Sequence, residues 1–535
     1  MSRRLRSTRR RTRSWLVAAT ATTLLVAAAG CSSAGGVSEG GGSSSPGSAT
    51  LRMALSGDMT TLDPTTEYQF EGSQVLTSVY EGLLDYATDS SNTIVPLLAA
   101  SFDVSTDGLT YTFKLRTDVT FADGTTMTSA AVKQSFERMG DKKVASQMGY
   151  MVAGVKSYET PDDATFVIHL KTPVASFLSL LASPFGPKII DPKVLDEHKS
   201  DDALAYLKTH TAGTGPYAVT QFDTGSQYTL TRNDHYWGAS PHFAAVTFKI
   251  IPDAANQVLQ LQGGDLDVIS GQPVATVQSF AGNADFHVEA QPLLQKAWLH
   301  VNRTGVLADQ KTREAVRASL DRNALVKQIW GSYATPSTQM YPVANLPAGL
   351  AADDWTTDTS ALKGALGGKT LTLGYIAGLT QDEQVAQALQ AQWQQAGVDV
   401  KLVPTQGSDY YGFSKDPSKA PDLLYEASYP DSAHPDAWAR LFFYSDQSTG
   451  SGGLNYLLAG SQEGDALMDR GLASLDADAA AADYGKAGDL VHDQVGYISL
   501  ADLQDVFITR ASISGFAHWL PTPRTLALKS LTGTP

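Results

Sequence analysis

Aromatic and acidic side chains gather in one stretch of the chain, between Tyr410 and Tyr444. The carboxylates Glu426 and Asp431 lie among the aromatic residues Tyr410, Tyr411, Tyr425, Tyr429, Trp438, Phe442, Phe443 and Tyr444. Aromatic rings give a ligand a large contact area at low entropic cost, and tyrosine hydroxyls can orient its polar groups. The stretch therefore predicts a binding site for a small polar molecule. The alternative is a hydrophobic core, which we favour for Phe442 and Phe443.

Serines, histidines and glycine-rich loops give little support for catalysis or for a metal centre. Gly225-Ser226 and Gly450-Ser451-Gly452 lack the Gly-x-Ser-x-Gly elbow, and neither Gly-x-x-x-x-Gly-Lys-Ser/Thr nor His-Glu-x-x-His occurs. The ten histidines are scattered singly, which argues against a zinc site made by the protein alone. We therefore expect no enzyme, no cofactor and no resident metal. A secreted hydrolase with two carboxylates across a cleft stays the alternative, because such a pair has no local motif.

His434 is the one histidine of interest, because it lies just beyond the aromatic and acidic stretch, in Ser432-Ala433-His434-Pro435. An imidazole at that place could bind a metal chelate such as a nickel complex. The alternative, which we favour, is an exposed histidine in a loop.

The only cysteine, Cys31, follows a leader typical of exported proteins. Seven arginines lie within the first 13 residues, an apolar run follows from Trp15 to Ala29, and Gly30-Cys31 ends the leader. The run is shorter than the ~20 residues of a membrane span. Leu25 to Cys31 resembles a bacterial lipobox, in which the cysteine thiol is acylated. We expect a signal peptide at 1–30, a Ser/Gly-rich flexible tether at 31–47, and a lipid anchor on Cys31. The alternative is ordinary cleavage after Ala29.

Composition limits the class of protein further. The chain has 535 residues, and 42% of them are hydrophobic. Without the leader, about 505 residues remain, which exceeds a single hydrophobic core and predicts two or three domains. Loss of the seven arginines takes the formal net charge from −15 to −22, which argues against nucleic acid as a partner. With Cys31 as the only cysteine, the exported body has no internal disulfide.

Hydrophobic periodicity predicts helices and strands mixed along the whole chain, and hence an α/β fold. Alternating residues around Asp107-Gly108 and around Pro161-Asp162-Asp163 predict two β-hairpins. Helical spacing predicts helices at Gln74–Tyr86, from Ser129 onward, at Lys311–Trp330 and at Gln381–Ala396. The last of these lies between the strand-like runs Leu371–Tyr375 and Val398–Val403, which predicts a βαβ unit.

Several short motifs together resemble the extracellular solute-binding proteins, family 5, of ABC importers, which include dipeptide-, oligopeptide- and nickel-binding lipoproteins. Each motif is weak alone, but their order and spacing cover the chain nearly end to end. They are Thr61-Leu62-Asp63-Pro64, Val79–Leu84, Phe113–Arg116, Phe121–Gly124, Ala131–Phe136, Gly213-Thr214-Gly215-Pro216-Tyr217, Arg232–Trp237, Gln262–Asp267, Asn302 and Arg313–Arg317.

The resemblance implies a two-lobed, periplasmic-binding-protein-like α/β fold of type II with three domains. Domain I would take residues 48–90, 206–297 and 509–535, domain II residues 91–205, and domain III, the second lobe, residues 298–508. Hinge strands would lie near 296–301 and 506–509, and ligand would close the lobes. The implied protein is a monomeric, lipid-anchored receptor on the outer face of the cytoplasmic membrane, which delivers a small solute to ABC permease subunits.

Peptide-binding relatives carry a Trp-x-x-Asp-Tyr pattern whose aspartate pairs with the α-amino group of the peptide. The matching positions are assigned here to Tyr425 and Ser428, so the carboxylate is missing. We therefore expect a ligand that is neutral, N-blocked, an oligosaccharide or a metal chelate, unless Glu426 or Asp431 supplies the charge. The predicted ligand-binding residues are Tyr68, Gln69, Met148, Tyr150, Trp298, Tyr425, Glu426, Ser428, Tyr429, Asp431 and Trp438, with stacking on Tyr425, Tyr429 and Trp438.

Overall fold

An eleven-stranded mixed sheet is the largest element of the fold. The computed structural model describes residues 49–89, 92–337, 339–342, 356–410, 412–446, 454–457, 459–519 and 521–535. The predicted leader, the tether, Cys31 and Tyr411 lie outside them. In spatial order the strands are β15 (Val400–Thr405), β14 (Leu371–Ile376), β16 (Leu423–Ser428), β12 (Phe286–Val301), β17 (Tyr497–Arg510), β11 (Val268–Ser270), β1 (Thr50–Leu55), β10 (Ala245–Ile250), β9 (Gln227–Arg232) and β8 (Tyr217–Asp223), and β13 (Ala334–Pro336) pairs with β17.

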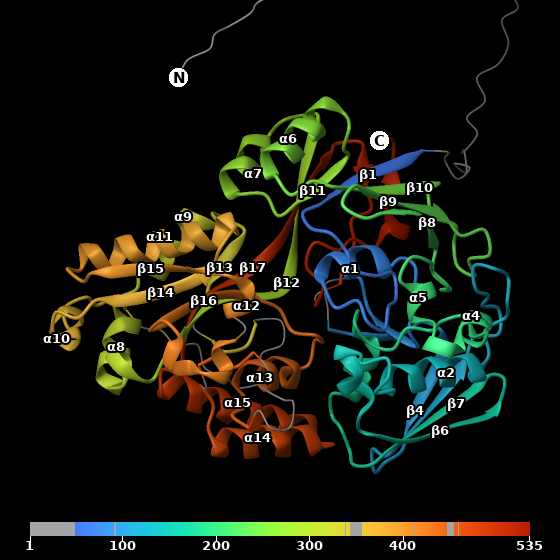
Figure 1. The fold of residues 1–535 in the computed structure, drawn as a ribbon, viewed down its shortest axis with the longest axis horizontal. Coiled ribbons are helices and arrows are strands. Elements are labelled where there is room, and N and C mark those ends of the chain that lie inside the picture. The colour runs from blue at the N-terminus through green and yellow to red at the C-terminus, as the bar shows by residue number, and fades with distance from the viewer. Residues whose placement is uncertain are drawn as a thin grey trace, which may run out of the picture. The chain divides into compact units, whose positions relative to one another are not determined.

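Two long antiparallel strands, β12 and β17, connect the two halves of this sheet (Figure 1). One half of the pair, Phe286–Pro292, lies beside β17 where β17 also pairs with β11. The other half, from Lys296, pairs with β16 on its free side. The register of the pair shifts between Pro292 and Lys296. The predicted hinge segments 296–301 and 506–509 therefore lie on these two strands.

A separate four-stranded antiparallel sheet carries its own core. Its order is β4 (Ala99–Val104), β5 (Thr110–Leu115), β7 (Thr165–Leu170) and β6 (Val155–Asp162). Helix α2 (Ser129–Gly140) places Phe136 against Phe166 of β7, with ring centroids 5.3 Å apart. Two small sheets complete the described strands, β2 (Leu84–Tyr86) with β3 (Ile94–Pro96) and β18 (Ile513–Ser514) with β19 (Thr532–Gly533).

Helices cover both faces of the strands between 298 and 508. Besides α2, the described α-helices are α1 (Phe70–Leu76), α3 (Phe177–Ala182), α4 (Pro192–Glu197), α5 (Leu204–Leu207), α6 (Ala254–Gly263), α7 (Val274–Phe280), α8 (Gln310–Ala318), α9 (Arg322–Ile329), α10 (Leu362–Leu366), α11 (Thr380–Gln395), α12 (Gly407–Tyr410), α13 (Pro435–Phe443), α14 (Gln462–Ala473) and α15 (Ala477–Asp493). Leu299 of β12 packs in the core shared with α8, α9 and α11, whereas its neighbour Trp298 packs in the core shared with α13, α14 and α15, as strand alternation requires.

Most of the elements predicted from periodicity are confirmed. Both hairpins form, β4 with β5 and β6 with β7, and Gly108 in the first turn has a φ of +67°, which suits glycine. The predicted βαβ unit is β14, α11 and β15, whose strands are parallel. The mixed α/β class is confirmed as well.

Two predicted helices are wrong in extent. The run Lys311–Trp330 is divided into α8 and α9, because the Asp321 side chain accepts a hydrogen bond from the backbone N–H of Ala324 and starts a new helix. The run Gln74–Tyr86 is helical only to Leu76, and its end forms β2. Apolar residues at helical spacing recur across such a break, so periodicity alone did not reveal it.

The domain boundaries remain predictions. The four-stranded sheet lies within the range 91–205 assigned to domain II, and β13 to β16 lie within the range 298–508 assigned to domain III. β12 and β17 each extend across a proposed boundary, so two of those boundaries fall inside strands.

A buried ion pair ties the Thr61–Pro64 turn to α2. Arg138 donates from Nη1 to Asp63 Oδ1 at 2.9 Å and from Nη2 to Asp63 Oδ2 at 2.5 Å. It also donates to the Thr65 hydroxyl at 2.6 Å. The Asp63 and Arg138 side chains are 1% and 5% exposed. Such a two-point contact fixes the turn, and removal of one partner leaves an uncompensated buried charge.

Replacement of this arginine tests how much the fold depends on the pair. We expect Arg138→Met to lower the free energy of unfolding by about 3–5 kcal/mol, because Asp63 stays buried without its partner. The matched control on the same helix is Lys133→Met, which removes an exposed ion pair to Glu137 worth about 0.5 kcal/mol. Urea unfolding followed by circular dichroism measures both. Equal, small effects of the two substitutions would contradict this account.

Candidate ligand-binding site

Asp431 is a buried carboxylate that receives hydrogen bonds from two distant tyrosines. It lies three residues beyond the end of β16 and is 4% exposed. Tyr68, just before α1, donates its hydroxyl to Asp431 Oδ1 and Oδ2 at 2.8 and 2.9 Å. Tyr150, in the 3₁₀ helix Gln147–Val152, donates to Oδ2 at 2.6 Å. Three predicted site residues, from the segments assigned to domains I, II and III, therefore meet at one carboxylate.

The electrostatics of this carboxylate are unusual. Burial raises the pKa of Asp431, and the hydrogen bonds from Tyr150 and Tyr68 act in the opposite direction. Burial and the nearby carboxylate also raise the pKa values of Tyr68 and Tyr150. No lysine, arginine or histidine in the described part of the chain forms an ion pair with Asp431, so its two partners are neutral donors.

The backbone around Asp431 is held by residues from the other side of the site. Ser183, just after α3, donates its hydroxyl to the Asp431 carbonyl oxygen at 2.5 Å. The N–H of Ala433 donates to the Tyr86 hydroxyl of β2 at 2.9 Å. These two hydrogen bonds join hydroxyl groups to the backbone at Asp431 and Ala433. They therefore position the Asp431 side chain without using its carboxylate oxygens.

A cavity of about 390 Å³ opens beside Asp431. Tyr150, Gly154 just before β6, and α3 line it on one side, and α13 with the end of α14 lines it on the other. Its apolar walls are formed by Met151, Val174, Phe177, Leu180, Leu441 and Leu472. Its charged lining residues are Asp431, Asp436 and Arg440. The volume falls within the range of small-molecule sites.

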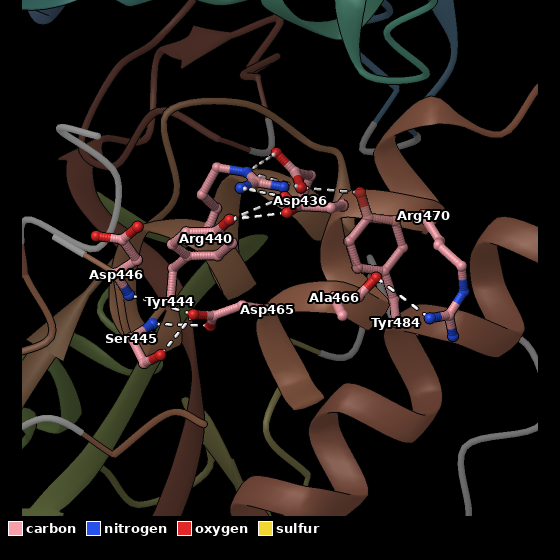
Figure 2. A network of polar contacts seen from close by, with 10 residues as sticks. Asp436, Arg440, Tyr444, Ser445, Asp446, Asp465, Ala466, Arg470 and Tyr484 are labelled. Atoms are coloured by element: carbon pink, nitrogen blue, oxygen red, sulfur yellow. Dashed lines mark hydrogen bonds and ion pairs between the residues drawn. The ribbon is translucent and has the colours of Figure 1, made fainter. Parts of the chain in front are cut away.

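Asp436 and Arg440 belong to a polar network that joins α13, α14 and α15 (Figure 2). Arg440 Nε donates to both Asp436 oxygens at 3.2 and 3.1 Å, and its Nη1 donates to Asp469 at 3.0 Å. The Tyr484 hydroxyl donates to Asp436 at 2.8 Å. The Arg440 guanidinium lies over the Tyr444 ring, 4.4 Å from its centroid. Because Asp436 is paired with Arg440, Asp431 is, of the two carboxylates lining the cavity, the one that no described cation pairs with.

The structure corrects the predicted stacking surface. Tyr425 and Trp438 are each 0% exposed and belong to the cores on opposite faces of the strands. Trp298, predicted as a cleft floor, is equally buried and packs edge-on against Trp438 at 5.1 Å between centroids. Met148 is also fully buried, in the core of the four-stranded sheet. These four positions leave no surface for a ligand, and only Tyr429 of the expected stacking rings keeps part of its surface exposed.

Glu426 is occupied elsewhere. Its Oε2 lies 2.6 Å from His300 Nε2, and both side chains are buried. Burial raises the pKa of Glu426, and the hydrogen bond with His300 opposes that shift. The Trp298 indole N–H also points at His300, at 3.1 Å. Of the two carboxylates that could replace the missing anchor, only Asp431 lies at the cavity.

The remaining predicted residues do not line the cavity. Ser428 is partly exposed at the end of β16, opposite Lys296, and Gln69 is exposed beside Tyr68. His434 is a helix cap: its Nδ1 accepts a hydrogen bond from the N–H of Asp436 at 3.1 Å. Burial lowers the pKa of His434. In the described residues no group of three or more His, Cys, Asp or Glu side chains is arranged to hold a metal.

Sequence reasoning missed several lining residues. Asp436 and Arg440 are spaced i,i+4 on a helix that begins with Pro435, a pattern that does signal an ion pair. The apolar residues Val174, Phe177 and Leu180 gave no such signal, because nothing local separates a cavity wall from a core.

Comparison with known proteins places this arrangement in a family. Residues 93–450 match the bacterial extracellular solute-binding proteins, family 5 middle region. A probable D,D-dipeptide-binding periplasmic protein, DdpA, from Escherichia coli (strain K12) is 29% identical over 484 residues, which cover 86% of this chain and 90% of that protein. The glutathione-binding protein GsiB of Salmonella typhi is 30% identical over 292 residues, which cover 54% of this chain and 56% of that protein.

Solved structures share the fold at lower identity. The periplasmic binding protein DppA from Helicobacter pylori, in complex with the peptide STSA, superposes with a TM-score of 0.78 at 22% identity over 91% of this chain and 98% of that one. NikA from Brucella suis, in complex with Fe(III)-EDTA, gives 0.82 at 22% identity over 91% of this chain and 100% of that one. The expected two-lobed, periplasmic-binding-protein-like fold is thereby confirmed.

No helix in the described residues is both long and apolar enough to cross a membrane. Since the family match extends over more than half of its length, this chain belongs to the family 5 extracellular solute-binding proteins, the substrate receptors of ABC importers.

Proposed function

We propose that this receptor captures a solute with a free ammonium group, such as a short peptide, and that Asp431 pairs with that ammonium. The observation that carries the proposal is the buried Asp431 carboxylate, which lines a cavity of about 390 Å³ and, within the described part of the chain, accepts hydrogen bonds from two phenol hydroxyls and from no cation. A carboxylate in a low-dielectric site is costly unless a cation or several donors compensate it. An ammonium would supply both the charge and additional hydrogen-bond donors.

The sequence offers Asp431 as a carboxylate close to the expected anchor position. Read three residues later, the Trp-x-x-Asp-Tyr pattern of peptide-binding relatives has its aspartate at Asp431, but Ser428 and Ser432 then stand at the tryptophan and tyrosine positions, whereas the assignment from Tyr425 keeps Tyr429. The proposal therefore takes up the alternative that Asp431 supplies the missing charge, and it depends on the place of Asp431 at the cavity. DdpA and DppA, which resemble this chain, are described as binding a D,D-dipeptide and the peptide STSA.

Capture would close the site about the β12–β17 pair. Asp431 belongs to the segment assigned to domain III, whereas Tyr68 and Tyr150 belong to domains I and II. A ligand that contacts both sides favours the closed state by its differential affinity for that state. The loaded receptor would then deliver the solute to ABC permease subunits. The hydrolase alternative gains no support from the cavity, because one of its two lining carboxylates, Asp436, is paired with Arg440.

Removal of the Asp431 charge tests the proposal directly. We expect Asp431→Asn to weaken binding of free-amino dipeptides by about 10²–10⁴-fold, because the ammonium would then be buried without its partner. Isothermal titration calorimetry measures the change, after a thermal-shift screen of peptides, oligosaccharides and chelates selects the ligand. Glu426→Gln is the matched control, since Glu426 is a buried carboxylate of the same segment that pairs with His300. Stronger binding of N-acetylated peptides or of saccharides than of free-amino peptides would contradict the proposal.

The affinity should depend on pH with a bell shape. Burial raises the pKa of Asp431, and only its ionised form pairs with an ammonium, so affinity falls as pH falls through that raised pKa. It falls again above about pH 8, where the α-amino group of a peptide loses its proton. Each limb should approach a tenfold change per pH unit. Calorimetry between pH 4.5 and 9.5 checks this, and the acidic limb should vanish in Asp431→Asn. An acidic limb of unchanged size in the variant would show that another group titrates.

We also propose that Cys31 carries the lipid that holds the receptor at the membrane. The support is the lipobox-like sequence ahead of Cys31 and the Ser/Gly-rich segment after it. In a bacterial host we expect the wild-type protein to enter the detergent phase of a Triton X-114 extract and its N-terminal peptide to begin at an acylated Cys31. Cys31→Ser should move to the aqueous phase or keep its leader, and Ser32→Ala is the matched control. A wild-type N-terminus at Gly30 would favour ordinary cleavage after Ala29.

A further inference from the structure

The cavity beside Asp431 makes a prediction about the ligand that the carboxylate alone does not make. This inference rests on the proposed function. In an amino acid or a peptide, the ammonium and the first side chain are bonded to the same carbon atom. If the ammonium lies on Asp431, the first side chain must therefore begin within a few ångströms of that carboxylate. The cavity of about 390 Å³ is lined by Asp431 itself and opens at that distance.

We propose that this cavity selects the first side chain of the ligand and accepts a large apolar one. Four separate segments contribute its apolar walls: Met151 from the 3₁₀ helix, Val174, Phe177 and Leu180 at α3, Leu441 from α13 and Leu472 from α14. A polar side chain that entered between them would lose hydrogen bonds to water without replacement. An apolar side chain would instead remove its own surface and that of the walls from water.

The charged residues at this cavity do not reverse that preference. Asp436 accepts hydrogen bonds from Arg440 at 3.1 Å and from Tyr484 at 2.8 Å, and Arg440 also bonds to Asp469 at 3.0 Å. An ionic side chain of the ligand would have to compete with these existing pairs (Figure 2). Asp431 is engaged by the ammonium in the proposed complex. The compensated pairs therefore form a polar edge, and the apolar walls remain for the side chain.

The volume allows more than a methyl group. A single water molecule has a share of about 30 Å³ in the liquid, so a space of about 390 Å³ leaves an alanine side chain surrounded by unfilled volume. The atoms that line an unfilled apolar space lack partners for dispersion contacts, and a ligand side chain that fills the space supplies those partners. Leucine, with three more carbon atoms than alanine, should bind about 10- to 50-fold more tightly.

Gly154 offers a way to fill the same space from the protein side. It lines the cavity, its φ is not positive, and a Cβ added there would meet only Val174 Cγ2 at 3.7 Å, which is ordinary contact. A larger side chain at 154 can therefore project toward the cavity without forcing the backbone. Gly263, at the end of α6, has no atom within 4 Å of such a Cβ and does not line the cavity. It provides the matched control for a glycine-to-leucine change.

The experiment compares four dipeptides by calorimetry: Ala-Ala, Leu-Ala, Asn-Ala and Ala-Leu. We expect Leu-Ala to bind about 10- to 50-fold more tightly than Ala-Ala. Asn-Ala, whose side chain is close to leucine in shape but polar, should gain nothing over Ala-Ala. Ala-Leu should gain less than Leu-Ala, because its leucine is not bonded to the carbon that carries the ammonium.

Gly154→Leu should abolish the advantage of Leu-Ala over Ala-Ala, and Gly263→Leu should leave both affinities as in wild type. Equal affinities for all four dipeptides, with each lost in Asp431→Asn, would overturn this inference and leave the proposed function standing. An equal loss for Ala-Ala and Leu-Ala in Gly154→Leu would place the first side chain elsewhere and also overturn it. Failure of every free-amino dipeptide to bind wild-type protein would overturn the proposed function and this inference together.

Discussion

The pairing of β12 with β17 is the interaction on which the rest of this structure depends. Fourteen- and sixteen-residue strands are long for a globular protein, and here each one belongs to both halves of the main sheet. Near the point where the register shifts, Lys296 is fully buried and donates to Asp502 of the partner strand at 2.9 Å. Burial lowers the pKa of Lys296, and Asp502 opposes that shift. A buried ion pair adds little net stability but penalises every other register, because a slip would separate the charges.

The site follows from what this pair holds in place. β16 lies beside β12 and ends at Ser428, which directs the following residues toward the loop before α1 and toward the 3₁₀ helix Gln147–Val152. Asp431 then meets two hydroxyls whose residues are 363 and 281 positions away in sequence. Ser183 and Tyr86 fix the backbone of the same loop. The carboxylate is consequently positioned by rigid elements, although it lies on a loop, which is the usual arrangement of a binding residue on a stable scaffold.

Local patterns in the sequence predicted local structure well and tertiary contacts poorly. The hairpins at Gly108 and at Asp163, and the β14–α11–β15 unit, depend on alternation and helical spacing within about thirty residues, and they were predicted from those patterns. The division of Lys311–Trp330 into two helices depended on one capping side chain, Asp321, inside a periodic run.

Tyr68, Tyr150 and Asp431 were each proposed as site residues, but their meeting is decided by the fold. Tyr425 and Trp438 looked like ligand contacts because a core aromatic and a binding aromatic have the same composition and spacing.

The hydroxyls of Tyr68 and Tyr150 have a consequence for selection at this receptor. Both donate to Asp431, and a carboxylate offers about four acceptor positions, so they leave room for further donors on the same oxygens. In the proposed complex a solute would share Asp431 with the two phenols or take the place of one of them. Its gain is then the difference between its own hydrogen bonds and those that the phenols already make. Discrimination at this receptor would come from competition with the protein's own side chains as much as from the contacts that the cargo makes.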